Sequence, residues 1–239
     1  MNKLWTFGCS FTADWDEGNL PGEFTNPYVL FKKWRGGEWP PVWPYVLGNL
    51  LGYETINHGH GGNSNYKIMM DIMEDFDKFS KGDVVVVEWS VVNRFLLSHK
   101  NGNGPALCSI LPSNHSNDYP ISSDCINQVI VDRDNDLWKK EVYAWEEMIE
   151  EHARVKEYEV YFWTIDGNLI YTKPDEFKNK KKYPVSMGHN DLLGYIKKCG
   201  GLCIWEETNR EVFDVHFGES GHRVTATKIY NHIKKYRDE

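Results

Sequence analysis

Val84-Val85-Val86-Val87, which leads into Glu88 and Trp89, is a run of β-branched residues without polar alternation. A strand with this character has both faces buried, as strands in parallel sheets do. Apolar segments of strand length recur along the chain on both sides of this run. Together they predict the strands Lys3–Phe7, Tyr53–Asn57, Asp83–Glu88, Glu159–Thr164 and Gly201–Trp205.

Helical patterns fill most of the intervals between these strands. Apolar residues at helical spacing predict the helices Trp43–Leu51, Tyr66–Phe79, Leu137–Lys156, Asn190–Lys198 and Ser220–Tyr236. Alternating strands and helices predict an α/β fold, a three-layer sandwich around a parallel sheet. We expect one domain spanning residues 1–239, with inserts at about 13–41 and 97–136 that flank the functional site.

Two short motifs near the ends of the chain supply the residue types of a catalytic triad. Ser10 follows the first strand in the turn Gly8–Thr12, and Asp214 lies two residues before His216. A serine alcohol is a weak nucleophile unless a base takes its proton, and a carboxylate orients that base. Alone, each motif is more typical of a turn or a helix cap. Together they predict a triad of Ser10, His216 and Asp214.

Two further blocks of hydrogen-bond donors lie between these motifs. Asn57–Asn65 follows the second strand, and its glycines let backbone N–H groups approach a ligand closely. Glu88–Arg94 follows the third strand and contains a hydroxyl, an amide and a guanidinium. The carboxyl ends of parallel strands meet at one edge of a sheet, where open α/β sheets bind ligands. All four blocks are therefore expected at the same edge.

In this order the blocks resemble those of the SGNH hydrolases, the GDSL-like esterase and lipase superfamily. Gly8–Thr12 is similar to the first block, although Cys9 stands where the family has Asp. Asn57–Asn65 resembles the second block, and Asp214–His222 resembles the last. The resemblance implies a five-stranded parallel sheet in the flavodoxin-like order 2-1-3-4-5.

The resemblance also implies an oxyanion hole. Its donors would be the backbone N–H groups of Ser10 and Gly62 and the side chain of Asn93. The usual Gly-x-Asn-Asp of the third block is absent, so Ser90, closer to the strand end, is the alternative to Asn93.

These residues predict a serine hydrolase that cleaves a carboxylic ester or removes an acyl group through an acyl-enzyme on Ser10. Arg94, Trp15 and Trp89 are candidates for substrate contacts, and stacking tryptophans would favour a carbohydrate ester. A salt bridge is the alternative for Arg94, and packing of the insert is the alternative for its tryptophans. The other functional class is a non-catalytic protein that keeps the SGNH fold, such as a structural component of a phage particle.

The composition of the chain indicates which classes of binding partner and which cellular location to expect. The 41% hydrophobic content is sufficient for a full core, and the net charge of −8 disfavours a nucleic-acid binder. The sequence contains no apolar run of about 20 residues, so we expect no membrane span. The lack of a secretory signal pattern and the 5 cysteines predict a cytoplasmic protein. The resemblance to phage-encoded members of the family adds a virion-associated protein as the alternative. The sequence does not indicate the oligomeric state.

His58 and His60 are spaced as two zinc ligands can be. No further cysteine or carboxylate follows at a spacing that would complete the site, so no metal is expected. Serine hydrolysis requires no organic cofactor either. His222 is expected to be a residue of the last helix rather than a catalytic group.

Overall fold

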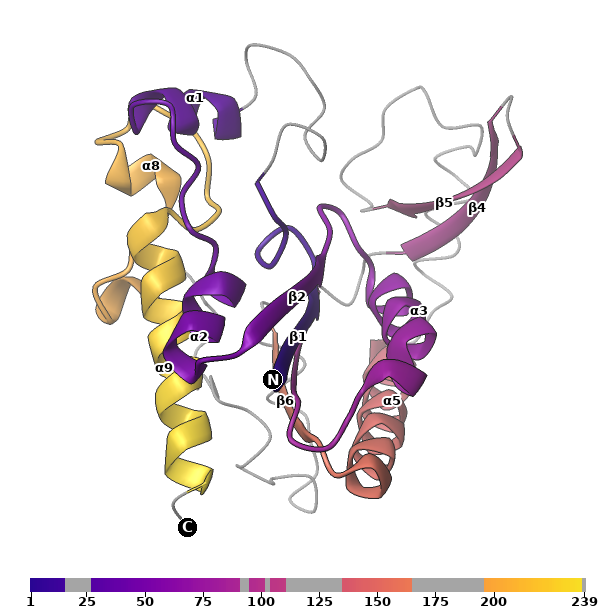
Figure 1. Ribbon diagram of the computed structural model, residues 1–239. Helices are drawn as coiled ribbons and strands as arrows, with labels where there is room; N and C mark the ends of the chain where they lie inside the picture. The colour runs from indigo at the N-terminus through magenta and orange to yellow at the C-terminus, as the bar shows by residue number, and fades with distance from the viewer. Residues whose placement is uncertain (16–26, 91–94, 102–103, 111–134, 165–195, 238–239) are drawn as a thin grey trace.

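A computed structural model describes residues 1–15, 27–90, 95–101, 104–110, 135–164 and 196–237 of the protein. Four parallel strands form the central sheet in the order β2-β1-β3-β6. Their bounds are Lys3–Gly8 for β1, Glu54–Gly59 for β2, Val84–Trp89 for β3 and Glu159–Thr164 for β6. All four carboxyl ends meet at the edge that points upward in Figure 1.

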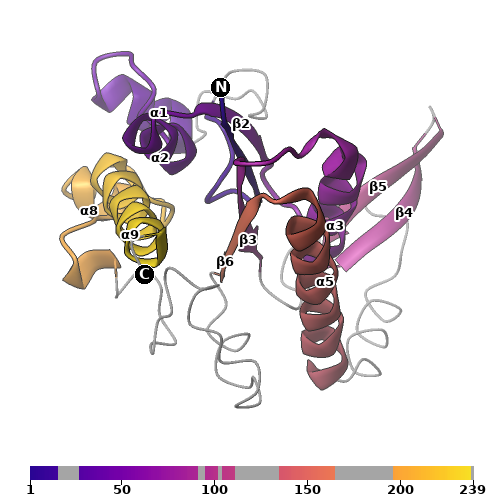
Figure 2. The same cartoon turned by 60° about the horizontal axis from the view of Figure 1, so that its bottom comes forward.

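Side chains of each strand alternate between two hydrophobic cores. Val85 and Val87 face a core that contains residues of α3 (Asn65–Asp75) and α5 (Asn135–Lys156). Val84 and Val86 face the opposite core, with residues of α2 (Trp43–Leu51) and α9 (Glu219–Arg237). Figures 1 and 2 show these two helix pairs on opposite sides of the sheet. The result is a three-layer α/β sandwich, as the alternation in the sequence predicts.

Each buried valine of β3 is completely inaccessible to solvent, at 0% exposure. Burial of a side chain of this size contributes about 1.5–3 kcal/mol to folding. The strand is thus held rigidly from both faces, and the loop that follows it leaves the sheet from a fixed point. Within the described ranges, no helix has the length and apolar character needed to cross a membrane.

The loop between β2 and α3 is fixed by a helix cap. The Ser64 hydroxyl accepts a hydrogen bond from the backbone N–H of Lys67 at 3.3 Å, so α3 begins directly after the glycines of that loop. Such a cap stabilises a helix by about 1 kcal/mol. A short 3₁₀ helix, η1 (Phe76–Lys78), ends this segment before β3.

The prediction of a fifth strand at Gly201–Trp205 is wrong. Cys203 forms an isolated antiparallel bridge with Phe217, and Ile204–Glu207 forms the helix α8. Two acidic residues lie in the first turn of α8, where the helix dipole favours negative charge. The segment therefore pairs with the loop that carries His216 and is not a strand of the described sheet.

The other strands and four of the helices agree with the sequence to within a few residues, apart from the end of α3, which continues as η1. Of the predicted helix Asn190–Lys198, only the last residues lie within the described ranges. The first insert contains α1 (Pro27–Trp34). The second contains most of an antiparallel hairpin, β4 (Phe95–Asn101) and β5 (Gly104–Ile110).

Candidate active site

The turn after β1 presents the candidate nucleophile. The carbonyl oxygen of Cys9 accepts hydrogen bonds from the backbone N–H groups of Thr12, at 2.9 Å, and Ala13, at 3.0 Å. These bonds close a single helical turn over Ser10 and Phe11. Cys9 and Thr12 are buried, whereas Ser10 is partly exposed, so its hydroxyl is accessible at the carboxyl edge of the sheet.

His216 lies against this turn although 206 residues separate it from Ser10. Its Nε2 atom is 2.7 Å from Ser10 Oγ, and its Nδ1 atom is 2.7 Å from Asp214 Oδ1. An ionised carboxylate only accepts hydrogen bonds, so with Asp214 ionised the Nδ1–H group is the donor of this hydrogen bond. Nε2 is then the acceptor for the Ser10 hydroxyl. The structure brings together all three residues of the predicted triad, at distances that this tautomer satisfies.

Hydrogen bonds within the turn and from the start of α8 hold the loop that carries Asp214 and His216. Asp214 Oδ1 also accepts the backbone N–H of His216 at 2.6 Å, which closes the short turn between the two residues. On the outer side, Trp205 N donates to the Asp214 carbonyl at 3.0 Å and Ile204 N donates to the His216 carbonyl at 2.9 Å. The start of α8 therefore sets the position of the imidazole.

Two aromatic rings contact the imidazole of His216. The ring of Phe11 lies 4.7 Å from it and that of Tyr28, from α1, lies 5.5 Å from it. Burial, together with the negative charges of Asp214 and Cys9 nearby, raises the pKa of Tyr28 above its usual range, so its phenol stays protonated. The His216 side chain remains 22% exposed, which leaves a path for substrate.

The loop after β2 supplies a second set of donors beside the nucleophile. The backbone N–H of His60 and the side-chain amide of Asn63 both donate to the Gly8 carbonyl, each at 3.2 Å. Gly62 lies between them with a φ of +85°, a conformation that other residues rarely adopt. Within the described residues, the N–H groups of Ser10 and Gly62 donate to no acceptor. Both predicted backbone donors of the oxyanion hole are therefore free to bind a ligand.

The third donor remains a prediction, because Asn93 and Arg94 lie outside the described residues. Its alternative, Ser90, is completely buried at the end of β3. The side chain of Asn65 clamps the backbone of Ser90: Ser90 N donates to Asn65 Oδ1 at 2.6 Å, and Asn65 Nδ2 donates to Ser90 O at 3.1 Å. This clamp fixes the point at which the third block leaves the sheet.

Both tryptophans predicted to contact substrate pack in the interior instead. Trp89 is 1% exposed, and its indole N–H donates to the buried carboxylate of Glu146 at 2.9 Å. Trp15 is 5% exposed and packs against Tyr28 and Phe31. Burial of these large rings contributes to the core and leaves no face for a sugar or an acyl group.

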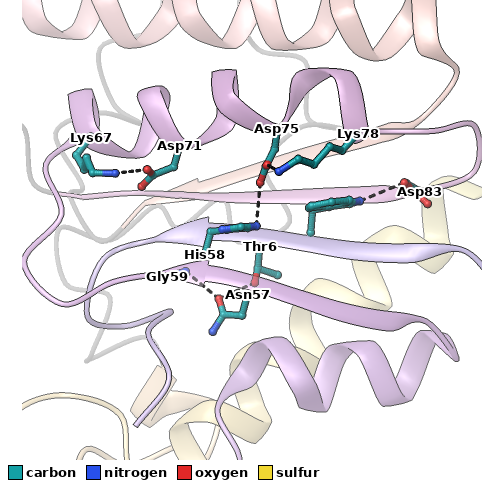
Figure 3. A network of polar contacts seen from close by, with 10 residues as sticks. Thr6, Asn57, His58, Gly59, Lys67, Asp71, Asp75, Lys78 and Asp83 are labelled. Carbon is teal, nitrogen blue, oxygen red and sulfur yellow. Dashed lines mark hydrogen bonds and ion pairs between the residues drawn. The ribbon is translucent and has the colours of Figure 1, made fainter. Parts of the chain in front are cut away.

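The two histidines with zinc-like spacing are separated by their environments. His58 Nε2 lies 2.9 Å from Asp75 Oδ2 (Figure 3). The ring of His58 stacks on that of Phe7, with 5.0 Å between the ring centroids. His60 is exposed, and its Nδ1 atom lies 2.9 Å from the Gly61 carbonyl oxygen. In the described part of the chain, no group of three or more His, Cys, Asp or Glu side chains is arranged to hold a metal ion.

His222 lies in the first turns of α9, as expected, and is completely buried. Its Nδ1 atom accepts the backbone N–H of Trp43 at 3.2 Å, and its ring packs edge-on against Trp15 and Phe217. Burial in these apolar surroundings, with a smaller effect from His216, lowers the pKa of His222 to about 3. Its imidazole is therefore neutral and joins α9 to the start of α2.

Glu88 is a residue that the sequence analysis did not assign to the site. Its carboxylate is completely buried under the nucleophile turn and accepts the backbone N–H of Cys9 at 3.2 Å and the hydroxyl of Thr12. The signal was an acidic residue directly after four buried valines. That signal alone does not identify the donors, which lie 76 or more residues away in the sequence.

Neither a protein-family model nor a curated protein matches this sequence. A hydroxyl in contact with an oriented imidazole can act as a nucleophile, and N–H groups without an acceptor can stabilise a developing oxyanion. This combination fits acyl transfer.

Proposed function

We propose that the protein is a serine hydrolase of the SGNH type, which cleaves a carboxylic ester or removes an acyl group. The observation that carries the proposal is the continuous chain Asp214–His216–Ser10, in which both hydrogen bonds of the imidazole measure 2.7 Å. Each role needs a specific atom, and each atom lies within hydrogen-bonding reach of the next.

In the first half of the reaction, Ser10 Oγ attacks the carbonyl carbon of the ester while His216 Nε2 accepts the hydroxyl proton. Asp214 keeps the second nitrogen protonated and stabilises the imidazolium that forms. The tetrahedral intermediate collapses when the imidazolium returns the proton to the leaving alcohol. The acyl group then remains as an ester on Ser10.

The negative charge of the intermediate requires donors that do not have to reorganise. The N–H groups of Ser10 and Gly62 are suited to this role because they have no other acceptor among the described residues. One such donor commonly stabilises a transition state by about 3 kcal/mol. We assign the third donor to the side chain of Asn93, with Ser90 as the alternative.

In the second half, His216 removes a proton from water, which attacks the acyl-enzyme and releases the acid. An alcohol or an amine in place of water would make the same site an acyltransferase, since the covalent intermediate is identical. The proposal therefore specifies acyl transfer through Ser10, with hydrolysis as its simplest outcome. Carbohydrate esters remain one substrate class within it, although Trp15 and Trp89 no longer support them.

The proposal is tested by hydrolysis of p-nitrophenyl acetate by the wild-type protein and two matched variants. Ser10→Ala is expected to lower kcat by at least about 10⁴-fold, since members of a triad act as a unit. Ser80→Ala removes the hydroxyl of an exposed serine near the amino end of β3 and is expected to change kcat less than about twofold. Equal turnover by Ser10→Ala and the wild-type protein would contradict the proposal.

A further inference from the structure

Glu88 is a charged residue in a strand that is otherwise apolar and completely buried. It lies at the carboxyl end of β3, and its exposure is 0%. Removal of a carboxylate from water destabilises a protein unless hydrogen-bond donors compensate for the lost hydration. The position of those donors shows what this carboxylate holds.

The turn that carries the nucleophile supplies several donors to Glu88. The backbone N–H of Cys9 donates to Oε2 at 3.2 Å, and the Thr12 hydroxyl donates to the same oxygen. The thiol of Cys9 lies 3.0 Å from Oε1. The contact requires glycine at position 8, because a Cβ on Gly8 would lie 2.8 Å from Glu88 Cβ. The carboxylate and the turn are therefore in the closest approach that the backbone permits.

Hydrogen bonds to Glu88 are donated from both sides of Ser10 in the sequence. Cys9 precedes the nucleophile and Thr12 follows it by two residues, whereas the Ser10 hydroxyl contacts His216. The Cys9 N–H is thus bonded inward, and the Ser10 N–H is left for the oxyanion. Charge-assisted hydrogen bonds are stronger and shorter than neutral ones, which suits a group that fixes geometry.

We propose that Glu88 is a positioning residue of the nucleophile, which holds the turn 9–12 so that the Ser10 hydroxyl meets His216 and its N–H faces the substrate. This inference rests on the proposed function, because it gives Glu88 a role in the reactivity of Ser10. A displacement of about 1 Å in such a site can cost about 10²-fold in rate. Glu88 therefore acts on rate and has little effect on substrate binding.

The second-order rate at which a fluorophosphonate labels Ser10 measures this role directly, together with kcat and KM for an ester. Glu88→Gln and Thr12→Val are each expected to slow labelling and kcat by about 10- to 100-fold with KM changed less than about threefold. Thr12→Ser keeps the hydroxyl and is expected to recover most of the rate. If Glu88→Gln does not fold, Thr12→Val and Thr12→Ser still provide the comparison.

Asp83→Asn is the matched control for loss of a buried carboxylate. Asp83 is 3% exposed and also accepts several donors, among them Lys3 N at 2.9 Å and Trp5 Nε1 at 3.1 Å, but at the amino end of the sheet. It is expected to lower thermal stability without slowing the labelling of folded protein. Equal slowing by Asp83→Asn and Glu88→Gln, or wild-type labelling of Glu88→Gln and Thr12→Val, would overturn the inference. A wild-type protein that is not labelled at Ser10 would overturn the proposed function and this inference with it.

Discussion

Two histidine–carboxylate pairs among the described residues have nearly the same separation, 2.7 Å for His216–Asp214 and 2.9 Å for His58–Asp75. They differ in what surrounds the imidazole. His216 makes a hydrogen bond to Ser10 with its second nitrogen, whereas neither nitrogen of His58 contacts a hydroxyl among the described residues. A histidine–carboxylate pair is thus a candidate catalytic base only when the second imidazole nitrogen contacts a group, such as a hydroxyl, whose proton it can accept.

The two pairs are also built differently. Asp75 contacts both His58 and Lys78 (Figure 3). The His58 ring stacks parallel to the rings of Phe7 and Trp5. These contacts join α3 to β2 and β1. Asp214 and His216, in contrast, lie in one short turn, and their side chains face the nucleophile. The first pair fits a structural role, and the second fits a catalytic one.

The largest expected effect separates the two pairs by mutation. His216→Ala is expected to lower kcat for ester hydrolysis by at least about 10⁴-fold, because the loss of the base disables the triad as a unit. His58→Ala is expected to leave kcat within about threefold. Steady-state kinetics on folded protein measures both, and a comparable loss in His58→Ala would end the distinction.

A smaller effect is expected at the third oxyanion donor. Asn93→Ala is expected to lower kcat by about 10²-fold with little change in KM, since the bond strengthens mainly in the transition state. Ser90→Ala is expected to be much milder. The reverse order would transfer the role to Ser90, and two negligible effects would leave only the backbone donors.

The pH dependence of the rate provides a third comparison. An imidazole base accepts a proton only while it is neutral, so kcat/KM is expected to fall as the solution is made acidic. The profile should be the same in His58→Ala and in excess EDTA. A flat profile would count against a histidine base, and loss of activity in EDTA would indicate a metal at His58 and His60.

The last comparison concerns stability rather than rate, and His222, an imidazole that has no carboxylate partner among the described residues. The folded state lowers its pKa to about 3, while an unfolded chain has the ordinary value of about 6.5. Between these values the unfolded state binds more protons, so stability is lost as the pH falls from about 6.5 towards 3. The expected loss is about 1.4 kcal/mol per pH unit.

His222→Gln is the comparison for this effect, since it cannot titrate. Its free energy of unfolding, measured by urea denaturation from pH 4 to 7, is expected to vary less with pH than that of the wild-type protein. Parallel curves for the two proteins would show that His222 does not contribute to the acid sensitivity.

The sequence predicts those parts of the fold that depend on local pattern. Val84–Val87 identifies a strand buried on both faces, and helical periodicity identifies α2, α5 and α9. The segment Gly201–Trp205 is also largely apolar, but three of its backbone hydrogen bonds join it to residues 214–218. That pairing is a tertiary contact, which composition does not predict. The apolar composition alone therefore led to the wrong prediction of a strand.

The site shows the same division. The order of the motifs predicts that Ser10, Asp214 and His216 meet, and they do. The order cannot tell that Trp89 faces the core, because the end of β3 is buried on both faces. Nor can it identify Glu88 as the partner of Cys9 and Thr12, since that contact depends on the register between β1 and β3.

The central claim is that Ser10 is a nucleophile activated by His216. Incubation with a fluorophosphonate probe, followed by mass mapping of the labelled peptide, tests it most directly. The account predicts stoichiometric labelling at Ser10 in the wild-type protein and in His58→Ala, and labelling slowed by orders of magnitude in His216→Ala. Labelling at another residue, or none at Ser10 in folded wild-type protein, would contradict it and favour a non-catalytic protein with this fold.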